Sequence, residues 1–403
     1  MSLDEQVLNY PIPNDTALEP PPEWAELRGK CPVAHVKLPS GDQATLLTKY
    51  DDVKQVLADP RFTRQLSAPD AARLTAEGGG VFNSDVANII PDSGDEHLHW
   101  RRLVGKWFTA KRMAALRPAM AKIADDLIDE MVAGGAPGDL KAGLGFPLPV
   151  YVICDMLGVP AEDRDRFSYW SDTFLNLTRY TKEEIDAAQA EFFQYMSDHV
   201  NARREQLGDD LLSELLAVGG PDEGGLSDLQ ILVTGMALLV AGHETTANMI
   251  GKMMGMLLAD RTRWERLLAD PSLIRTTVEE SLRFDANSGF GLPRYLPVET
   301  EVDGTVLPKG TTVICSMAAA NRDESAFEAA DEMDLTRSPN AHLSFGSGAH
   351  SCLGQSLART ELQVVLEVLL RRLPTLELAV PAEELRRVEG LAVGGLSTVP
   401  VRW

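Results

Sequence analysis

Phe345-Gly346-Ser347-Gly348-Ala349-His350-Ser351-Cys352-Leu353-Gly354 is a segment in which small residues surround a single cysteine. Residues 356–366 follow it with apolar side chains at helical spacing, which places Cys352 just before the N-terminus of a predicted helix. The partial positive charge of a helix N-terminus favours a thiolate. The glycines allow a sharp turn and a close backbone approach to a flat group. The segment therefore predicts a loop in which the Cys352 sulfur is an anionic metal ligand.

A lone cysteine in a glycine-rich loop is more often inert than functional, but the flanking residues here match the pattern Phe-Gly-x-Gly-x-His-x-Cys-x-Gly. This pattern resembles the signature of the cytochrome P-450 superfamily, and the whole chain is similar to bacterial members of the actinobacterial natural-product type. The resemblance implies that Cys352 is the axial thiolate of a heme b iron. It also implies that Phe345 packs over the sulfur and that His350 faces a haem propionate. Gly346 and Gly354 belong to the same cofactor-binding loop.

Composition limits the class of protein. The chain has 403 residues with 44% hydrophobic content, which is enough for a large core. A formal charge of -22 disfavours general nucleic-acid binding, because a polyanion would be repelled. The first residues contain neither a basic segment nor an apolar run, and the apolar run 231–242 is too short to cross a bilayer. We expect a cytoplasmic monomer with no membrane anchor.

Helical periodicity dominates the chain and predicts a fold that is mainly α with a minor β part. Strand-like alternation is confined to residues 34–47 around a Ser-Gly-Asp turn, to 300–307 and 311–315, and to the neighbourhoods of Val380 and Val399. We expect one domain over residues 1–403, with residues 1–30 wrapping the surface. By resemblance this is the cytochrome P-450 fold, with a long distal helix at 229–258 and the haem-thiolate loop at 345–354.

The segment Ala241-Gly242-His243-Glu244-Thr245-Thr246-Ala247-Asn248 interrupts the long apolar helix with polar residues. A zinc-binding His-Glu-x-x-His pattern fails because Ala247 stands where the second histidine belongs. Thr245 could simply hydrogen-bond the carbonyl one turn back. The resemblance instead implies that Gly242 makes room for dioxygen beside the iron, that Thr245 donates a hydrogen bond to the bound oxygen and that Glu244 relays protons. His243 is expected on the helix surface or in an ion pair.

Glu280 and Arg283 are three residues apart and therefore adjacent on one helical face, where a bidentate ion pair can form. By itself this spacing has little meaning. It matches the superfamily's Glu-x-x-Arg, which an arginine before the cysteine loop completes, and Arg337 fits that position. The resemblance implies that the three side chains are structural and hold the segment leading to the thiolate loop.

His97 and Arg101 lie one helical turn apart and match a His-x-x-x-Arg segment by which similar proteins hold a propionate. Arg294 resembles the arginine that follows the Glu-x-x-Arg helix. Together with His350 they would supply the two propionates with charge-assisted hydrogen bonds. The alternative is that they are ordinary surface cations.

Residues 97–124 contain seven lysines and arginines and no carboxylate, although the whole chain is acidic. By resemblance this segment lies on the proximal side of the haem and docks an acidic ferredoxin. The docking hypothesis names Arg102, Lys106, Lys111, Arg112 and Arg359. No dinucleotide fingerprint is present, so electrons would come from a ferredoxin and an NAD(P)H-dependent ferredoxin reductase.

The resemblance predicts a haem-thiolate monooxygenase that uses O2 to hydroxylate or epoxidise a bulky apolar natural product, such as a polyketide or terpenoid. A peroxide-driven peroxygenase and a non-catalytic haem sensor are the alternatives. Gly289 and Gly291 suggest a roomy pocket. The predicted pocket residues are Val81, Phe82, Ile89, Ile90, Met236, Ala237, Val240, Phe290, Leu292, Val393 and Leu396.

Overall fold

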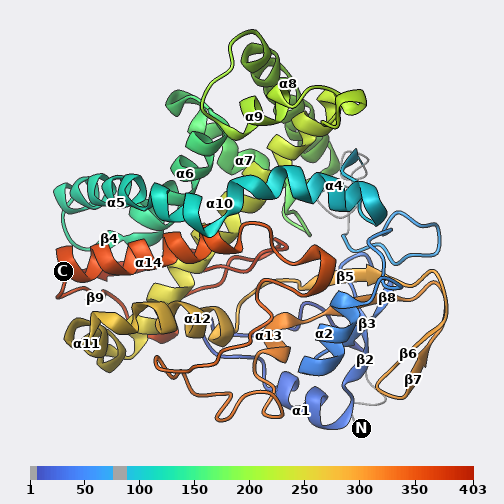
Figure 1. Cartoon of the computed structure of the whole chain (residues 1–403). Helices are drawn as coiled ribbons and strands as arrows, with labels where there is room; N and C mark the ends of the chain where they lie inside the picture. Colours follow the sequence, from blue (N-terminus) through green and yellow to red (C-terminus); the bar gives the residue numbers. More distant parts are fainter. Residues whose placement is uncertain (1–6, 76–88) are drawn as a thin grey trace.

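The computed structural model describes residues 7–75 and 89–403, and it is mainly helical with small sheets at its margins (Figure 1). This confirms the predicted fold class. The helices are α1 Glu23–Lys30, α2 Tyr50–Ala58, α4 Gly94–Gly105, α5 Ala110–Ala133, α6 Pro147–Leu157, α7 Arg164–Phe174, α8 Lys182–Glu205, α9 Leu211–Ala217, α10 Asp228–Ala259, α11 Arg261–Ala269, α12 Ile274–Phe284, α13 Met317–Ala320 and α14 Gln355–Arg372. Among the described residues, no helix combines the length and the apolar character that a bilayer span requires.

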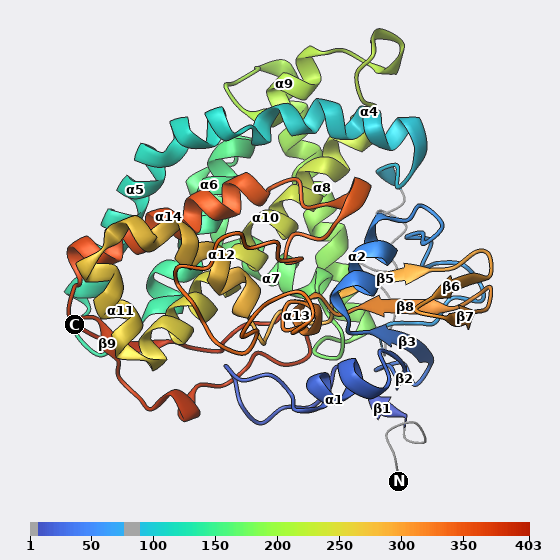
Figure 2. The same cartoon turned by 60° about the horizontal axis from the view of Figure 1, so that its bottom comes forward.

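Helix α10 is the central element, and it passes through the middle of the helical part in both views (Figures 1 and 2). Its start is set by a capping box, in which the Ser227 hydroxyl accepts from the Gln230 N–H and the Gln230 side chain accepts from the Ser227 N–H. The apolar sequence that follows is buried almost throughout, because α6, α7, α8, α12 and α14 pack around it. The predicted helix 229–258 is therefore confirmed to within a residue at each end.

The strands form a five-stranded sheet in the order β1-β2-β3-β8-β5, on the far side of the molecule from α5 (Figure 2). The hairpin predicted at 34–47 is confirmed, with Val33 opposite Leu47, and β3 pairs with β8 in parallel. Two smaller sheets are β4-β10-β9 and β6-β7. Strand bounds are β1 Leu8–Asn9, β2 Val33–Lys37, β3 Gln43–Leu47, β4 Gly138–Asp139, β5 Leu292–Tyr295, β6 Thr300–Val302, β7 Thr305–Leu307, β8 Thr312–Cys315, β9 Glu377–Leu378 and β10 Pro400–Arg402.

The N-terminal segment does more than wrap the surface. Tyr10, Ile12 and Trp24 are buried in a hydrophobic cluster with Phe290, and the Tyr10 hydroxyl donates to the Phe290 carbonyl at 2.6 Å. Burial of these apolar side chains ties the segment to the core. That residues 1–30 wrap the surface stays a prediction. A single domain over the whole chain stays a prediction.

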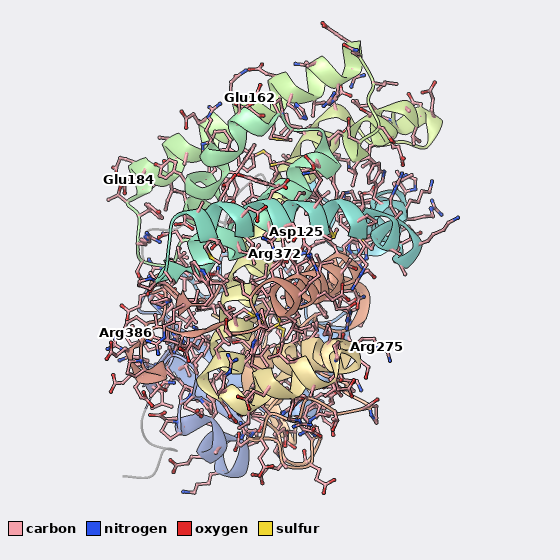
Figure 3. The ribbon with its side chains drawn as sticks, turned by 90° about the vertical axis from the view of Figure 1, so that its left-hand side faces the viewer. Asp125, Glu162, Glu184, Arg275, Arg372 and Arg386 are labelled. Atoms are coloured by element: carbon pink, nitrogen blue, oxygen red, sulfur yellow. The ribbon has the colours of Figure 1, made fainter. Side chains whose placement is uncertain are left out.

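Helix α14, which follows the cysteine loop, is held against α5 by ion pairs. Arg372 and Asp125 lie next to each other where the two helices pack (Figure 3), with Nη1 and Oδ1 2.8 Å apart. Arg371 joins the same carboxylate at 2.8 Å. These pairs are partly exposed, and each contributes little energy. They join two helices that already pack through apolar side chains of the main hydrophobic cluster.

Candidate active site

The Cys352 loop is a tight structure in which glycines are required by the packing. The Cys352 N–H donates to the Phe345 carbonyl at 2.7 Å, and α14 begins three residues later at Gln355, close to the predicted start. Gly346 and Gly348 have φ of +69° and +72°, which disfavours any side chain. A Cβ on Gly348 would also lie 2.6 Å from the Ala58 Cα atom. The backbone of α2 therefore approaches the loop too closely for any residue other than glycine.

The Cys352 thiol is accessible but densely surrounded by protein. This surrounding raises the pKa of the Cys352 thiol, and the Gly354 N–H, Arg101 and Arg359 offset it only in part. Without a bound metal, the helix N-terminus therefore does not by itself offset the effect of burial on this thiol. A metal cation at the sulfur would remove the proton, because only a thiolate binds a metal.

Cationic side chains gather beside the loop. The rings of His97 and His350 lie 4.4 Å apart, and Arg101 donates from Nη2 to the Ser351 carbonyl at 2.8 Å. Arg294 is 3% exposed and donates to the Pro293 carbonyl. Burial, followed by the positive charge of Arg64 and its neighbours, lowers the pKa of His350 to about 4. Burial lowers the pKa of His97 in the same way.

The two arginines of this cluster have no carboxylate partner in the described part of the chain, although the charge of Asp92 acts on Arg64 and His97. Among residues 7–75 and 89–403, neither Arg101 nor Arg294 forms an ion pair with a carboxylate. A buried guanidinium without an anion is costly, so the site fits a ligand that brings negative charge. A group with two carboxylates and a metal that accepts sulfur meets both requirements. The residues present therefore fit the haem that the sequence resemblance implies.

One face of α10 is open although the rest of the helix is buried. Ala237, Ala241 and Thr245 are exposed, and their spacing of four residues places them in one row. We call them the open row. Thr245 donates its hydroxyl to the Ala241 carbonyl at 2.7 Å, which is the back-bonding alternative considered above, and its oxygen can still accept. The open row offers a small-residue surface to a flat ligand or a substrate.

Glu244 points into the protein rather than along the open row. Its Oε1 accepts from the Asn248 amide at 2.7 Å, and its Oε2 lies 3.2 Å from Nε2 of His243. Burial opposes ionisation, but His243 and Asn248 outweigh it and hold the pKa of Glu244 below its ordinary value. His243 is fully buried, so the helix-surface part of its prediction is wrong and the ion-pair part fits.

Gly242 serves the packing of helices. A Cβ at this position would lie 3.1 Å from the side chain of Ile153 on α6. The missing side chain thus lets α6 approach α10 closely. Whether Gly242 also makes room for dioxygen stays a prediction.

Glu280, Arg283 and Arg337 come together as predicted. The Glu280 oxygens accept from Arg283 at 2.8 and 2.7 Å and from Arg337 at 3.2 and 3.1 Å. They also accept from the Asn340 amide and the Asp334 N–H, each at 2.9 Å. Arg283 reaches the carbonyls of residues 321, 330 and 332. One buried carboxylate thus ties α12 to the segment that leads to the cysteine loop.

The cations of the docking hypothesis differ in their surroundings. Arg112 pairs with Glu214 at 2.8 Å and stacks on Trp107, and Arg359 binds both oxygens of Glu279 at 2.7 and 3.0 Å. Arg359 also lies over the Phe345 ring, so its role is structural. Docking by these two arginines is therefore not supported, because internal carboxylates already neutralise them. Arg102, Lys106 and Lys111 are exposed, and none of them pairs with a carboxylate of the described residues.

The predicted pocket residues differ in their exposure, and the pocket itself stays a prediction. Ala237 is exposed, and Ile89, Ile90, Leu292 and Val393 are half-buried. Four others, Met236, Val240, Phe290 and Leu396, are packed inside hydrophobic clusters, which contradicts their placement on a pocket wall. A Cβ on Gly289 or Gly291 would meet the carbonyl of residue 392 or 315, so backbone and not ligand fills that space. Val81 and Phe82 lie outside the described residues.

Sequence reasoning missed three residues near the site. Arg64 acts electrostatically on His350, and Asn340 completes the Glu280 network; no local pattern marked either of them. Glu361 is completely buried on α14, and burial raises its pKa to about 8. A signal for Glu361 existed, because it stands on the apolar face of the predicted helix with Leu357 and Val365.

Comparisons with known proteins agree with this geometry. A family model described as Cytochrome P450 matches residues 161–382. The chain is 40% identical over 398 residues to nocardicin C N-oxygenase of Nocardia uniformis subsp. tsuyamanensis and to mycinamicin IV hydroxylase/epoxidase of Micromonospora griseorubida, in each case over 98% of both chains. A solved structure of the putative thioether synthase SgvP, involved in the tailoring step of griseoviridin, is similar with a TM-score of 0.93, 37% identity and coverage of 99% of this chain and 100% of that one.

Proposed function

The chain belongs to the cytochrome P450 family and is a monooxygenase that uses haem iron, O2 and redox partners, and we propose that it hydroxylates or epoxidises a bulky apolar natural product. The names of its relatives support this substrate class, since they include an N-oxygenase for nocardicin C, a hydroxylase/epoxidase for mycinamicin IV and a pentalenolactone synthase. A polyketide or a terpenoid would suit the apolar open row.

The cofactor in this proposal is heme b. Cys352 would hold its iron through sulfur, and Arg101, Arg294, His97 and His350 would bind its carboxylates. Non-covalent heme b is supported because the chain has no Cys-x-x-Cys-His attachment motif. When bound, a thiolate-ligated haem supplies the electron density that favours cleavage of the O–O bond.

The protein's own contribution lies on α10. Glu244 is ionised at neutral pH, because its pKa is lowered, and it can therefore take up a proton from the solvent side. Thr245 holds a hydroxyl on the open row, where it would turn from the Ala241 carbonyl to donate a hydrogen bond to a ligand. In this proposal Glu244 takes up the proton only in passing and transfers it to Thr245, which delivers it. The buried surroundings of α10 exclude bulk water from the transfer.

The electron donor in this proposal is a ferredoxin, reduced by an NAD(P)H-dependent ferredoxin reductase. The exposed cations Arg102, Lys106 and Lys111 support a docking surface for an acidic protein, because the remainder of this acidic chain would repel one. We propose that the protein works as a monomer. A cytoplasmic location stays a prediction.

The observation that bears most of the proposal is the accessible Cys352 sulfur beside Arg101 and Arg294, which pair with no carboxylate of the described residues. The test is to purify the protein with haem and record the reduced carbonyl complex, which should show the red-shifted absorption of sulfur coordination. Cys352→Ala should lose it. A library of natural products is then screened for compounds that shift the haem iron from low to high spin, as seen in the absorption spectrum. Compounds that do so are incubated with ferredoxin, reductase and isotopically labelled O2. Unlabelled product, or product formed with peroxide alone, would contradict a monooxygenase.

A further inference from the structure

His243 is a titratable side chain that the proposed chemistry does not use. It stands on α10 directly before Glu244, is 0% exposed, and has the edge of the Phe146 ring against it with the centroids 5.3 Å apart. A histidine in such a place needs partners for both ring nitrogens, because unpaired buried polar atoms are costly.

The partners of Nδ1 determine the tautomer. Nδ1 lies 3.1 Å from the Leu239 carbonyl oxygen and 3.4 Å from Oγ of Ser171 on α7. A carbonyl oxygen only accepts hydrogen bonds. Nδ1 therefore bears a proton, and in the neutral ring Nε2 is left as an acceptor.

The other nitrogen faces an acceptor. Nε2 lies 3.2 Å from Oε2 of Glu244, and neither atom has a well-aligned hydrogen bond to any other described residue. The second carboxylate oxygen is already held by Asn248 at 2.7 Å, so the carboxylate cannot simply rotate away. Two buried lone pairs at this distance repel each other unless a proton lies between them.

We propose that His243 is a positioning residue that shares one proton with Glu244 and holds that proton ready for transfer. The proposal rests on the proton-passing role of Glu244 described above. The shared proton moves from Nε2 to Oε2 and leaves through Glu244, so that a neutral ring with its hydrogen on Nδ1 and an ionised carboxylate remain. One proton from solvent then returns the pair to its starting state.

Charged groups on the neighbouring elements surround the His243–Glu244 pair. Asp172, next to Ser171 on α7, is partly exposed, and its pKa is raised by burial and then by the charge of Glu244. Its carboxylate also pairs with Arg179 at 3.1 Å and accepts from the Tyr180 hydroxyl at 3.3 Å. Lys141 donates from Nζ to the Leu396 carbonyl at 2.6 Å; burial lowers its pKa, and the charges of Glu244 and Asp172 oppose that shift. These groups set the charge around the pair.

The first test reads the proton directly by 15N NMR of ring nitrogens in the holoenzyme, as its diamagnetic reduced carbonyl complex. The chain has 7 histidines, and His243→Gln or His243→Asn assigns the signal by its loss. We expect the 15N chemical shift of Nδ1 to be that of a protonated nitrogen, and the shift of Nε2 to lie between the values of protonated and unprotonated nitrogen. In Glu244→Gln, Nε2 should move to the unprotonated position, because Asn248 would hold the amide oxygen and leave the NH2 group to donate to Nε2. An unprotonated Nδ1, or an Nε2 unchanged by Glu244→Gln, would overturn the proposal.

The second test measures coupling, the product formed per NAD(P)H consumed. A general acid contributes about 10²–10⁴-fold, so loss of the group that holds its proton ready for transfer should lower coupling by about tenfold and shift its pH profile, with haem content unchanged. His199→Gln is the matched control, because His199 also contacts a carbonyl, that of Leu157 at 3.0 Å, and pairs with no carboxylate of the described residues. Unchanged coupling in His243→Gln refutes the inference. A wild type that forms no product while the NMR signature is present refutes the proposed function instead.

Discussion

The most demanding prediction concerns Glu280, the buried carboxylate that joins α12 to the segment before the cysteine loop. Replacement by glutamine keeps the shape and removes the charge. The new amide group would face the guanidinium of Arg283 and the side chains of Arg337 and Asn340, all of which donate hydrogen bonds. Glu280→Gln therefore leaves two cations without a counter-charge in a place where Glu280 and Arg283 are both 0% exposed.

The magnitude follows from that burial. Breaking a buried ion pair from one side costs about 3–5 kcal/mol. A chain of 403 residues unfolds with an entropy of roughly 0.85 kcal/mol/K on the usual per-residue value, so the midpoint temperature should fall by about 4–6 °C. Because the network positions residues 334–340, the haem should also dissociate faster. Glu280→Ala should lose the cofactor altogether.

The assay is denaturant unfolding, together with transfer of haem to an apoprotein acceptor. Glu328→Gln is the matched control, because Glu328 lies in the same segment with an exposed side chain. Its stability should stay within about 0.5 kcal/mol of the parent chain. If Glu280→Gln unfolds like the parent chain and keeps full Soret absorbance, the network does not hold the loop and the reasoning fails.

The remaining predictions concern the loop, a buried acid and the docking surface. Gly348→Ala should destabilise the loop and lower haem occupancy, because its Cβ would lie 2.6 Å from the backbone of Ala58; normal haem titration would contradict this. Glu361, with its pKa raised from 4.5 to about 8, binds a proton more readily folded than unfolded, so stability is lost as pH rises from about 4.5 to about 8. Glu361→Gln should remove that loss, which is about 5 kcal/mol in total and about 3 kcal/mol between pH 6 and pH 9, where unfolding is measured; an equal loss in the parent chain and the variant would refute it. Reversing the charges of Arg102 and Lys106 should slow ferredoxin-supported reduction in a salt-dependent way, and unchanged rates would exclude this surface.

The sequence by itself determined the helices, the hairpin and the position of the cysteine loop. These depend on neighbours in the chain: the apolar period of α10 and its capping Ser227, or the spacing of Cys352 before Gln355. Periodicity and capping are local properties, so they can be predicted before the chain is folded. The Glu280–Arg283 pair is of the same kind, because helical geometry alone places the two on one face.

Only the tertiary structure decided which side chains form ion pairs and which are buried. Arg112 and Arg359 had the same appearance in the sequence as Lys106, yet carboxylates 102 and 80 residues away neutralise them. Phe290 and Leu396 suited a pocket by their chemistry but lie inside the core. Burial also raised the pKa of Cys352, against the effect expected from the helix N-terminus. Burial and charge partners depend on segments far apart in the chain, and these meet only when the core forms.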